Sequence, residues 1–205
     1  MNLAWHVRPD GGLELPALSW CPPSPVRAAS TSVLGGGIGP RAWFLNASVP
    51  AGYAADDPVS DLLALAAGAG LDGDGVGMLT AKDVRDVVVE EDDGVQVAAT
   101  VGLGWPTWAA APPDADVAVV GTVNLLVVVP AALGDAALVN AVATATEAKV
   151  QALLEAGVDG TGTASDAVCV AAADDGPAEA YGGPRSRWGA PLARAVHRAV
   201  LRGAR

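Results

Sequence analysis

A loop of small hydroxyl side chains and one carboxylate precedes an apolar run late in the chain. Residues 159–173 read DGTGTASDAVCVAAA, which places Thr161, Thr163, Ser165 and Asp166 at the entrance of a predicted buried strand. A carboxylate there can act as a general base or orient a water molecule, and loop N–H groups can stabilise an oxyanion. Thr163 or Ser165 can act as a nucleophile if a base lies nearby. The structural alternative is that these hydroxyls only cap turns.

The two lysines, Lys82 and Lys149, are further candidates for acid–base chemistry, because a buried lysine can exchange its proton whereas arginine stays charged. Residues 134–157 predict a helix whose buried stripe comprises Val139, Val142, Thr146, Val150 and Leu153. At about 100° per residue, Lys149 falls about 60° from the centre of that stripe, at the margin of the buried face. Glu147 lies about 200° away from Lys149 around the helix and cannot pair with it directly. In the structural alternative, Lys149 extends over the core edge and Glu147 is solvated.

Uncharged polar residues also interrupt apolar runs. Asn124 lies inside an otherwise apolar strand, and an unpaired buried amide costs about 1–3 kcal/mol, so it needs a partner in the core or in a ligand. Thr80 and Thr100 each end an apolar run and have the same two interpretations. The GGGIG run at 35–39 lacks the spacing of a dinucleotide loop; its glycines instead allow close approach of a strand or a ligand.

The residue inventory excludes several kinds of site. His6 and His197 are the only histidines, which argues against a Ser/His/Asp triad and against a histidine-rich metal site. Cys21 and Cys169 lie far apart in the sequence and belong to no CxxC pair, so neither a zinc site nor a disulfide framework is predicted. The sequence therefore predicts no protein-bound metal.

The composition is that of a folded chain. Of the 205 residues, 51% are hydrophobic and 17% are charged, which fits one domain over residues 1–205 with a hairpin at 1–29. The net charge of −11 argues against a nucleic-acid partner, since such proteins present clustered lysine and arginine. The N-terminal residues lack the pattern of a signal peptide, and a cytoplasmic location is expected.

Residues 117–134 contain no charged side chain and approach the length of a membrane helix. Their valine content, Asn124 and Pro130 favour a buried strand over 117–129 followed by a turn, and no membrane partner is predicted.

The order of elements predicts an α+β fold. Hairpins are expected around residues 9–12 and around Asp93-Gly94, with strands at 30–34 and 41–49. A first helix is expected after the Asp57 cap, and an amphipathic helix should close the chain. We therefore predict a single domain with a mixed, largely antiparallel sheet covered by helices.

An ordered set of motifs resembles the adenosylcobinamide amidohydrolase family of corrinoid salvage. The matching segments are LGGG (34–37), FLNASVP (44–50), DDP (56–58), VGMLTA (76–81), GTVNLLV (121–127), ATATEAK (143–149), TGTASDAVCVA (161–171), YGGP (181–184) and WGAPLARAV (188–196). The resemblance runs from about residue 30 to the C-terminus. No single segment is decisive, but the ordered set is specific.

The resemblance implies hydrolysis of the amide that joins the aminopropanol arm to the corrin ring of adenosylcobinamide, giving adenosylcobyric acid. It implies no cofactor, because cobalt arrives with the corrinoid substrate, and a homo-oligomer is left open. The candidate catalytic residues are Asp166, Lys149, Thr163 and Glu147. The candidate substrate-binding residues are Gly36, Asn46, Thr80, Thr100, Trp105, Thr122, Asn124, Thr161 and Ser165.

One segment departs from the family pattern. The family tends to show Thr-Ala-Gly followed by Asn, whereas residues 100–106 read TVGLGWP, with Trp105 and Pro106 at the place of that amide. Two alternatives therefore stand beside the amidohydrolase prediction: a non-catalytic corrinoid-binding homologue, and a generic amidase with a threonine nucleophile. The tryptophan-bearing loop after Gly102 is expected to cover the edge of an apolar macrocycle.

Overall fold

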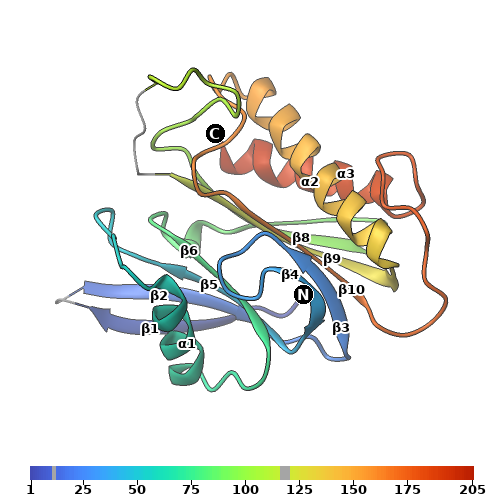
Figure 1. Ribbon diagram of the computed structural model, residues 1–205, viewed down its shortest axis with the longest axis horizontal. Helices are drawn as coiled ribbons and strands as arrows, with labels where there is room; N and C mark the ends of the chain where they lie inside the picture. Colours follow the sequence, from blue (N-terminus) through green and yellow to red (C-terminus); the bar gives the residue numbers. More distant parts are fainter. Residues whose placement is uncertain (11–12, 116–120) are drawn as a thin grey trace.

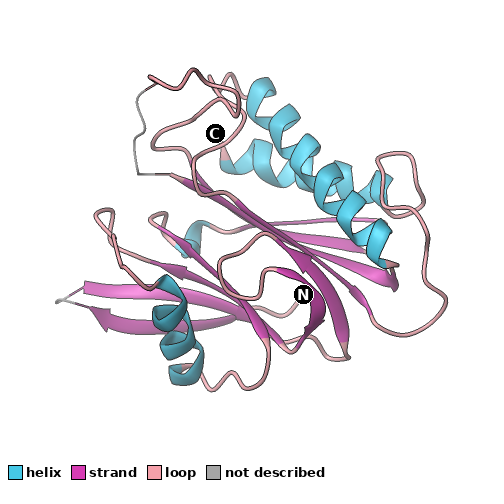
Figure 2. Ribbon diagram, in the orientation of Figure 1, coloured by secondary structure: helices cyan, strands magenta, loops and turns pink. Residues whose placement is uncertain are grey.

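The computed structural model describes residues 1–10, 13–115 and 121–205, which form two sheets and three helices (Figures 1 and 2). The first half contains β1 (Ala4–Asp10), β2 (Leu13–Trp20), β3 (Val26–Ser30), β4 (Gly37–Arg41), β5 (Trp43–Ser48), α1 (Pro58–Gly68) and β6 (Gly75–Thr80). The second half contains a 3₁₀ turn (Val84–Asp86), β7 (Val88–Asp92), β8 (Val95–Gly102), β9 (Thr122–Ala132), α2 (Asp135–Glu155), β10 (Ala167–Ala173) and α3 (Gly189–Gly203).

The strands divide between a four-stranded sheet, in the order β1-β2-β5-β6, and a six-stranded sheet, in the order β4-β3-β10-β9-β8-β7. Among the strand pairs of the described residues, β5–β6 and β9–β10 are parallel and the others are antiparallel. The predicted α+β class with largely antiparallel, mixed pairing is confirmed, but the strands form two sheets where we expected one. The alternation of apolar residues identifies strands without stating which distant strand each one pairs with, so it could not reveal this division.

Alternating side chains build four layers. On β9, Val123, Leu125 and Val127 pack against α2 and α3, whereas Leu126 faces the core between the two sheets. The outer face of the four-stranded sheet is covered by α1, through Leu62 and Ala66. Figure 1 shows α2 and α3 on one side of the molecule and α1 on the other.

Several local predictions are confirmed. Asp57 caps α1, where its side chain accepts from the Ser60 N–H at 3.0 Å, and the β7–β8 turn places Asp93 and Gly94 at positive φ. The closing helix α3 is present, and β1 pairs with β2 as the predicted hairpin requires, although residues 11–12 of its turn lie outside the described part of the chain. The predicted strand at 117–129 corresponds to β9, although residues 117–120 lie outside the described part of the chain. Among the described residues, none of the helices combines the length and apolar character that crossing a membrane requires.

The strand predicted at 30–34 is wrong. β3 ends at Ser30, and at the next residue the Val168 N–H donates to the Thr31 hydroxyl while the Thr31 N–H donates to the Val168 carbonyl, each at 3.0 Å. The glycine run supplies β4 and passes beside β6. Gly35 has a φ of 72°, and a Cβ there would lie 2.1 Å from the Gly75 carbonyl oxygen. The close approach that these glycines permit is therefore to another strand.

The predicted buried face of α2 is correct at Leu153 but displaced at the other positions. Val139 is 58% exposed, whereas the buried positions are Ala137, Leu138, Ala141, Thr144, Ala145, Ala148, Lys149, Ala152 and Leu153. Small alanines allow α2 to lie close to the sheet and to α3, and the larger valines flank this contact. Lys149 consequently lies within the buried face and not at its margin.

Candidate active site

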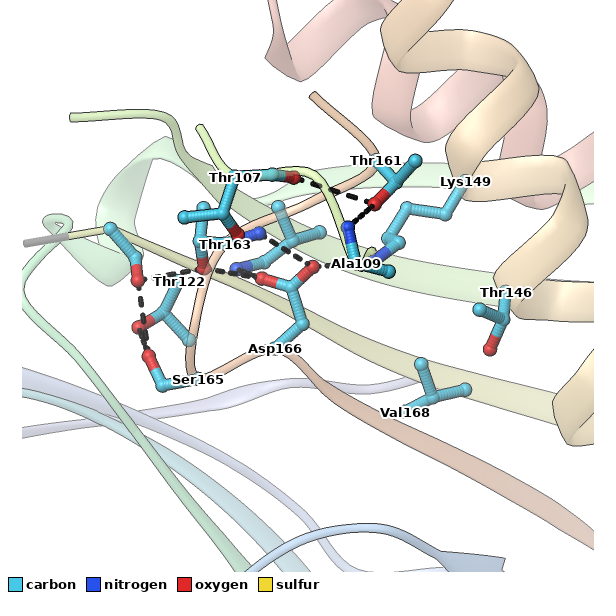
Figure 3. Close-up of polar contacts among 12 residues, drawn as sticks. Thr107, Ala109, Thr122, Thr146, Lys149, Thr161, Thr163, Ser165, Asp166 and Val168 are labelled. Atoms are coloured by element: carbon cyan, nitrogen blue, oxygen red, sulfur yellow. Dashed lines mark hydrogen bonds and ion pairs between the residues drawn. The ribbon is translucent and has the colours of Figure 1, made fainter. Parts of the chain in front are cut away.

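Asp166 occupies the loop residue immediately before β10, beside the first residues of β9 (Figure 3). Its Oδ1 accepts the Val123 N–H at 2.8 Å and the Thr163 hydroxyl at 2.6 Å. Its Oδ2 accepts the Thr163 N–H at 3.2 Å. Backbone donors from a strand and from the same loop thus fix the orientation of this carboxylate.

Lys149 reaches the same carboxylate from α2. Its Nζ forms a short ion pair with Asp166 Oδ2, and the two side chains are only 7% and 10% exposed. Removing one partner of a buried pair leaves an uncompensated charge, so each of these residues depends on the other. The parallel β9-α2-β10 connection creates the contact, because it returns the second half of α2 to the edge where β10 begins.

Gly162 is the residue that leaves room for the ion pair. A Cβ at this position would lie 2.2 Å from Asp166 Oδ2 and 2.5 Å from Lys149 Nζ. Since real Cβ atoms essentially never approach other atoms so closely, any side chain here would displace one of the two partners. Glycine is therefore required for the Lys149–Asp166 contact.

Hydroxyl groups form a second chain of contacts around the Gly121 carbonyl. Thr163 Oγ1 lies 2.8 Å from this oxygen and shares its single proton between it and Asp166 Oδ1. Ser165 Oγ donates to the same oxygen at 3.0 Å and lies 2.7 Å from Thr122 Oγ1. The loop that carries Asp166 is thereby tied to the start of β9. Ser165 is exposed, so its hydroxyl remains open to a ligand.

The tryptophan-bearing loop at 103–115 is fastened to the Asp166 loop. The Thr107 N–H donates to the Gly162 carbonyl and the Thr161 N–H donates to the Thr107 carbonyl, both at 2.8 Å. Trp108 Nε1 adds a bond to Asp159 Oδ1 at 2.9 Å. Trp105 is 46% exposed on this loop.

A separate polar cluster lies between the two sheets. Asn46 on β5 donates through Nδ2 to Thr100 Oγ1 on β8 at 3.0 Å, and its Oδ1 accepts from Asn124 Nδ2 at 2.8 Å. Asn124 Nδ2 also donates to the Leu79 carbonyl at 3.0 Å. All three side chains are buried, and the amides link the two sheets where β9 begins.

A cleft with an empty volume of about 750 Å³ opens beside both clusters. Asn124, Ser165 and Asp166 line one side, and Thr31–Val33 and Gly77–Leu79 line the other; Ala164 and Ala167 complete it. Lys149 and Thr163 are not among its lining residues. A ligand in this cleft would therefore lie against Asp166, whereas Lys149 and Thr163 would stay behind it.

A sequence profile described as adenosylcobinamide amidohydrolase matches residues 8–205, which include every residue of this site. The chain belongs to the adenosylcobinamide amidohydrolase family. An adenosylcobinamide amidohydrolase from Methanosarcina mazei is 32% identical over 185 residues, covering 86% of this chain and 88% of that protein. One from Halobacterium salinarum is 39% identical over 203 residues, covering 93% of this chain and 83% of that protein.

The structure brings most of the candidate site residues of this adenosylcobinamide amidohydrolase family member into two clusters. Asp166, Lys149 and Thr163 form one cluster; Thr122 and Ser165 adjoin it. Asn46, Thr100 and Asn124 form the second cluster. Thr161 holds the tryptophan loop, where its Oγ1 accepts from the Ala109 N–H at 2.9 Å.

Other candidate residues lie apart from these clusters. Glu147 is exposed on the far side of α2, as its angular distance from Lys149 requires. Gly36 is exposed in the turn before β4, where a Cβ would lie 2.7 Å from the Ser32 carbonyl oxygen. Thr80 is buried and its hydroxyl accepts from the Lys82 N–H at 3.0 Å, which stabilises a turn.

Sequence reasoning missed Gly162, the Val123 N–H and the cleft wall formed by Thr31–Val33. A glycine between two threonines and the STS run at 30–32 were visible signals. Their importance depends on contacts between segments far apart in the chain. Among the described residues, no group of three or more histidine, cysteine or acidic side chains is placed to hold a metal ion.

Proposed function

We propose that this chain hydrolyses the amide between the aminopropanol arm and the corrin ring of adenosylcobinamide, forming adenosylcobyric acid and free aminopropanol. The observation that carries the proposal is the Asp166 carboxylate, which is held by Lys149 and by two backbone N–H groups and which belongs to a residue that lines a cleft. Family membership over residues 8–205 supports the choice of substrate. Cobalt belongs to the substrate and takes no part as a protein cofactor.

In the proposed reaction, Asp166 orients a water molecule in the cleft and accepts its proton as the oxygen attacks the amide carbon. The tetrahedral intermediate then breaks its C–N bond, and the proton passes to the departing amine. Water and amide are thereby converted to carboxylic acid and amine. The exposed Ser165 hydroxyl lies at the same cleft and would donate to the developing oxyanion by turning away from the Gly121 carbonyl.

Lys149 acts in this scheme as a positioning residue. Its Nζ is directed to Asp166 Oδ2, and it is not among the cleft-lining residues. The ammonium group therefore holds the carboxylate in place and balances its charge in a site with little solvent. This geometry favours positioning over direct contact with the substrate oxyanion.

Direct attack by water is also favoured over a threonine nucleophile. The Thr163 hydroxyl contacts Asp166 Oδ1 and the Gly121 carbonyl, and Thr163 does not line the cleft. A Thr163→Val variant should therefore retain measurable hydrolysis, reduced by about tenfold because one hydrogen bond to Asp166 is lost. Complete loss of hydrolysis in folded Thr163→Val, with covalent labelling of Thr163 in the wild type, would instead establish the nucleophile.

The decisive experiment is incubation of the purified protein with adenosylcobinamide in dim light without added metal, followed by mass analysis. We expect adenosylcobyric acid and aminopropanol, and a loss of about 10²–10⁴-fold in the rate for Asp166→Asn. Arg194→Ala, a change on the distant surface of α3, is the control and should retain the wild-type rate. A corrinoid absorbance shift without product would support the binding-protein alternative and contradict hydrolysis.

A further inference from the structure

The orientation of the Asn124 side-chain amide is fixed by its neighbours. The Leu79 carbonyl can only accept a hydrogen bond, so the atom 3.0 Å from it must be Asn124 Nδ2. The same nitrogen donates to Asn46 Oδ1, and this contact fixes the orientation of the Asn46 amide, because the Thr100 hydroxyl can either donate or accept. Both donor hydrogens of Asn124 are therefore used, and its Oδ1 must point elsewhere.

Asn124 Oδ1 is left without a donor. The atom is buried, and among the described residues no group is placed to donate a hydrogen bond to it. Buried polar side-chain atoms are normally paired, and leaving an acceptor unpaired costs free energy. Asn124 also lines the cleft beside Asp166. An unpaired acceptor on a residue of the cleft wall is suited to receive an N–H group from a ligand.

Asn124 and Asp166 lie close together at one end of the six-stranded sheet, and both line the cleft. Asn124 pairs in register with Ala167, the residue that follows Asp166. In an amide, the N–H is attached to the carbonyl carbon that water must attack, so groups that contact the two must be neighbours. Catalytic contacts often form fully only in the substrate complex, and because Oδ1 is buried the proposal requires the cleft wall at Asn124 to open when substrate binds.

We propose that Asn124 Oδ1 accepts the N–H of the scissile amide and so makes this site selective for secondary amides over esters. The inference rests on the proposed function, because it takes the aminopropanol amide as the substrate. Asn46 is the positioning residue, since it holds Asn124 Nδ2 away from the substrate. The nitrogen keeps its hydrogen until the C–N bond breaks, so the contact persists through the tetrahedral intermediate.

The test compares adenosylcobinamide with its ester analogue, in which propane-1,2-diol replaces aminopropanol and oxygen replaces the N–H. The ratio of kcat/KM for the amide to kcat/KM for the ester is measured in the wild type and in Asn124→Leu. We expect the ratio to fall about tenfold in the variant, the effect of one hydrogen bond. Both substrates are measured on the same preparation, so the folded fraction cancels from the ratio. An unchanged ratio would overturn the inference.

Thr144→Val is the matched control. Thr144 is a buried residue of α2 whose hydroxyl bonds to the Asn140 and Gly182 carbonyls, away from the cleft. Loss of the Thr144 hydroxyl removes buried hydrogen bonds without altering Asn124. The ratio of kcat/KM for the amide to kcat/KM for the ester should therefore stay at the wild-type value. A fall equal to that of Asn124→Leu would show that the ratio reports general damage and would contradict the assignment.

A binding measurement separates this inference from the proposed function. Both corrinoids are titrated by absorbance into Asp166→Asn and into the double variant with Asn124→Leu. We expect about tenfold tighter binding of the amide in the first protein and no preference in the second. That result without hydrolysis by the wild type would support the acceptor role and refute the hydrolase proposal. Hydrolysis by the wild type, together with an equal preference for the amide in both variants, would support the hydrolase proposal and refute the acceptor role of Asn124.

Discussion

The exposed ion pairs between α3 and β7 differ from the buried ion pair between Lys149 and Asp166. On the outer surface, α3 is attached to β7 by several guanidinium–carboxylate contacts, among them Arg194 and Arg198 with Asp92. The Arg194 side chain is 52% exposed, so water can take the place of a lost partner. Lys149 and Asp166 instead form one buried pair, in which neither partner can be replaced by solvent.

The difference lies in what fixes the geometry. Asp92 has two arginine partners, and its contact with Arg194 is the main reason that its pKa lies below the ordinary value. Asp166 has one cationic partner and is oriented by N–H groups of Val123 and Thr163. The surface contacts fasten one element to another, while the buried contacts hold a single carboxylate in one orientation, as chemistry in the cleft requires.

The largest difference between the buried pair and the surface contacts should appear when one positively charged side chain is removed from each. Lys149→Met leaves Asp166 buried without its partner, so we expect about 3–5 kcal/mol lower unfolding free energy and at least about 100-fold slower hydrolysis. Arg194→Ala should leave the rate unchanged and shift the urea midpoint only slightly, because exposed pairs contribute little. Urea denaturation and product formation measure both effects. A Lys149→Met protein with wild-type turnover would remove Lys149 from the proposed mechanism.

A smaller but sharper effect is expected from one methyl group. Gly162→Ala places a Cβ against both Asp166 Oδ2 and Lys149 Nζ, so it should separate the pair, reduce the rate about 100-fold and lower stability by about 1–3 kcal/mol.

Gly68→Ala is the control, because a Cβ at that last position of α1 meets no atom within 4 Å and the backbone there is helical. This variant should keep full activity. Equal rates for Gly162→Ala and Gly68→Ala would show that the close approach at Gly162 does not matter for turnover.

The smallest predicted effect is the loss of stability at low pH that comes from protonating Asp92. Since the folded-state pKa of Asp92 is lowered, chiefly by its bond to Arg194, its contribution to stability is present above the ordinary pKa of 3.8 and is lost as the pH falls through the folded value. An NMR titration of the carboxyl carbon should show a pKa below 3.8, which rises in Arg194→Ala. A value in the variant equal to that of the wild type would mean that Arg194 is not the cause.

Local sequence signals predicted the local structure well. Asp57 and Pro58 marked the start of α1, and Asp93-Gly94 marked the β7–β8 turn, because caps and turns depend on adjacent residues. The buried face of α2 was mispredicted because hydrophobicity alone favours valine, whereas close packing between helix and sheet selects alanine. The division into two sheets depends on pairings such as β3 with β10, which no local pattern encodes.

The residues of the candidate site, like the fold, could be predicted from the sequence only in part. Residue chemistry identified Asp166, Lys149 and Asn124, since charged and amide groups in apolar segments need partners. It could not predict that Lys149 pairs with Asp166, because that contact required the correct face of α2. Gly162 was missed because its importance lies in the space that its absent side chain leaves for two residues, one of them on another element.

The β9-α2-β10 connection has a consequence for how this protein could be modified. The ion pair and the hydroxyls around Gly121 all come from residues 121–166, whereas the opposite wall of the cleft comes from Thr31–Val33 and Gly77–Leu79. Reactive groups and much of the surrounding surface are thus encoded in separate stretches of the chain. Libraries confined to the distant wall would vary which amide is accepted while leaving the hydrolytic groups untouched, which makes that wall the place to begin engineering a new substrate range.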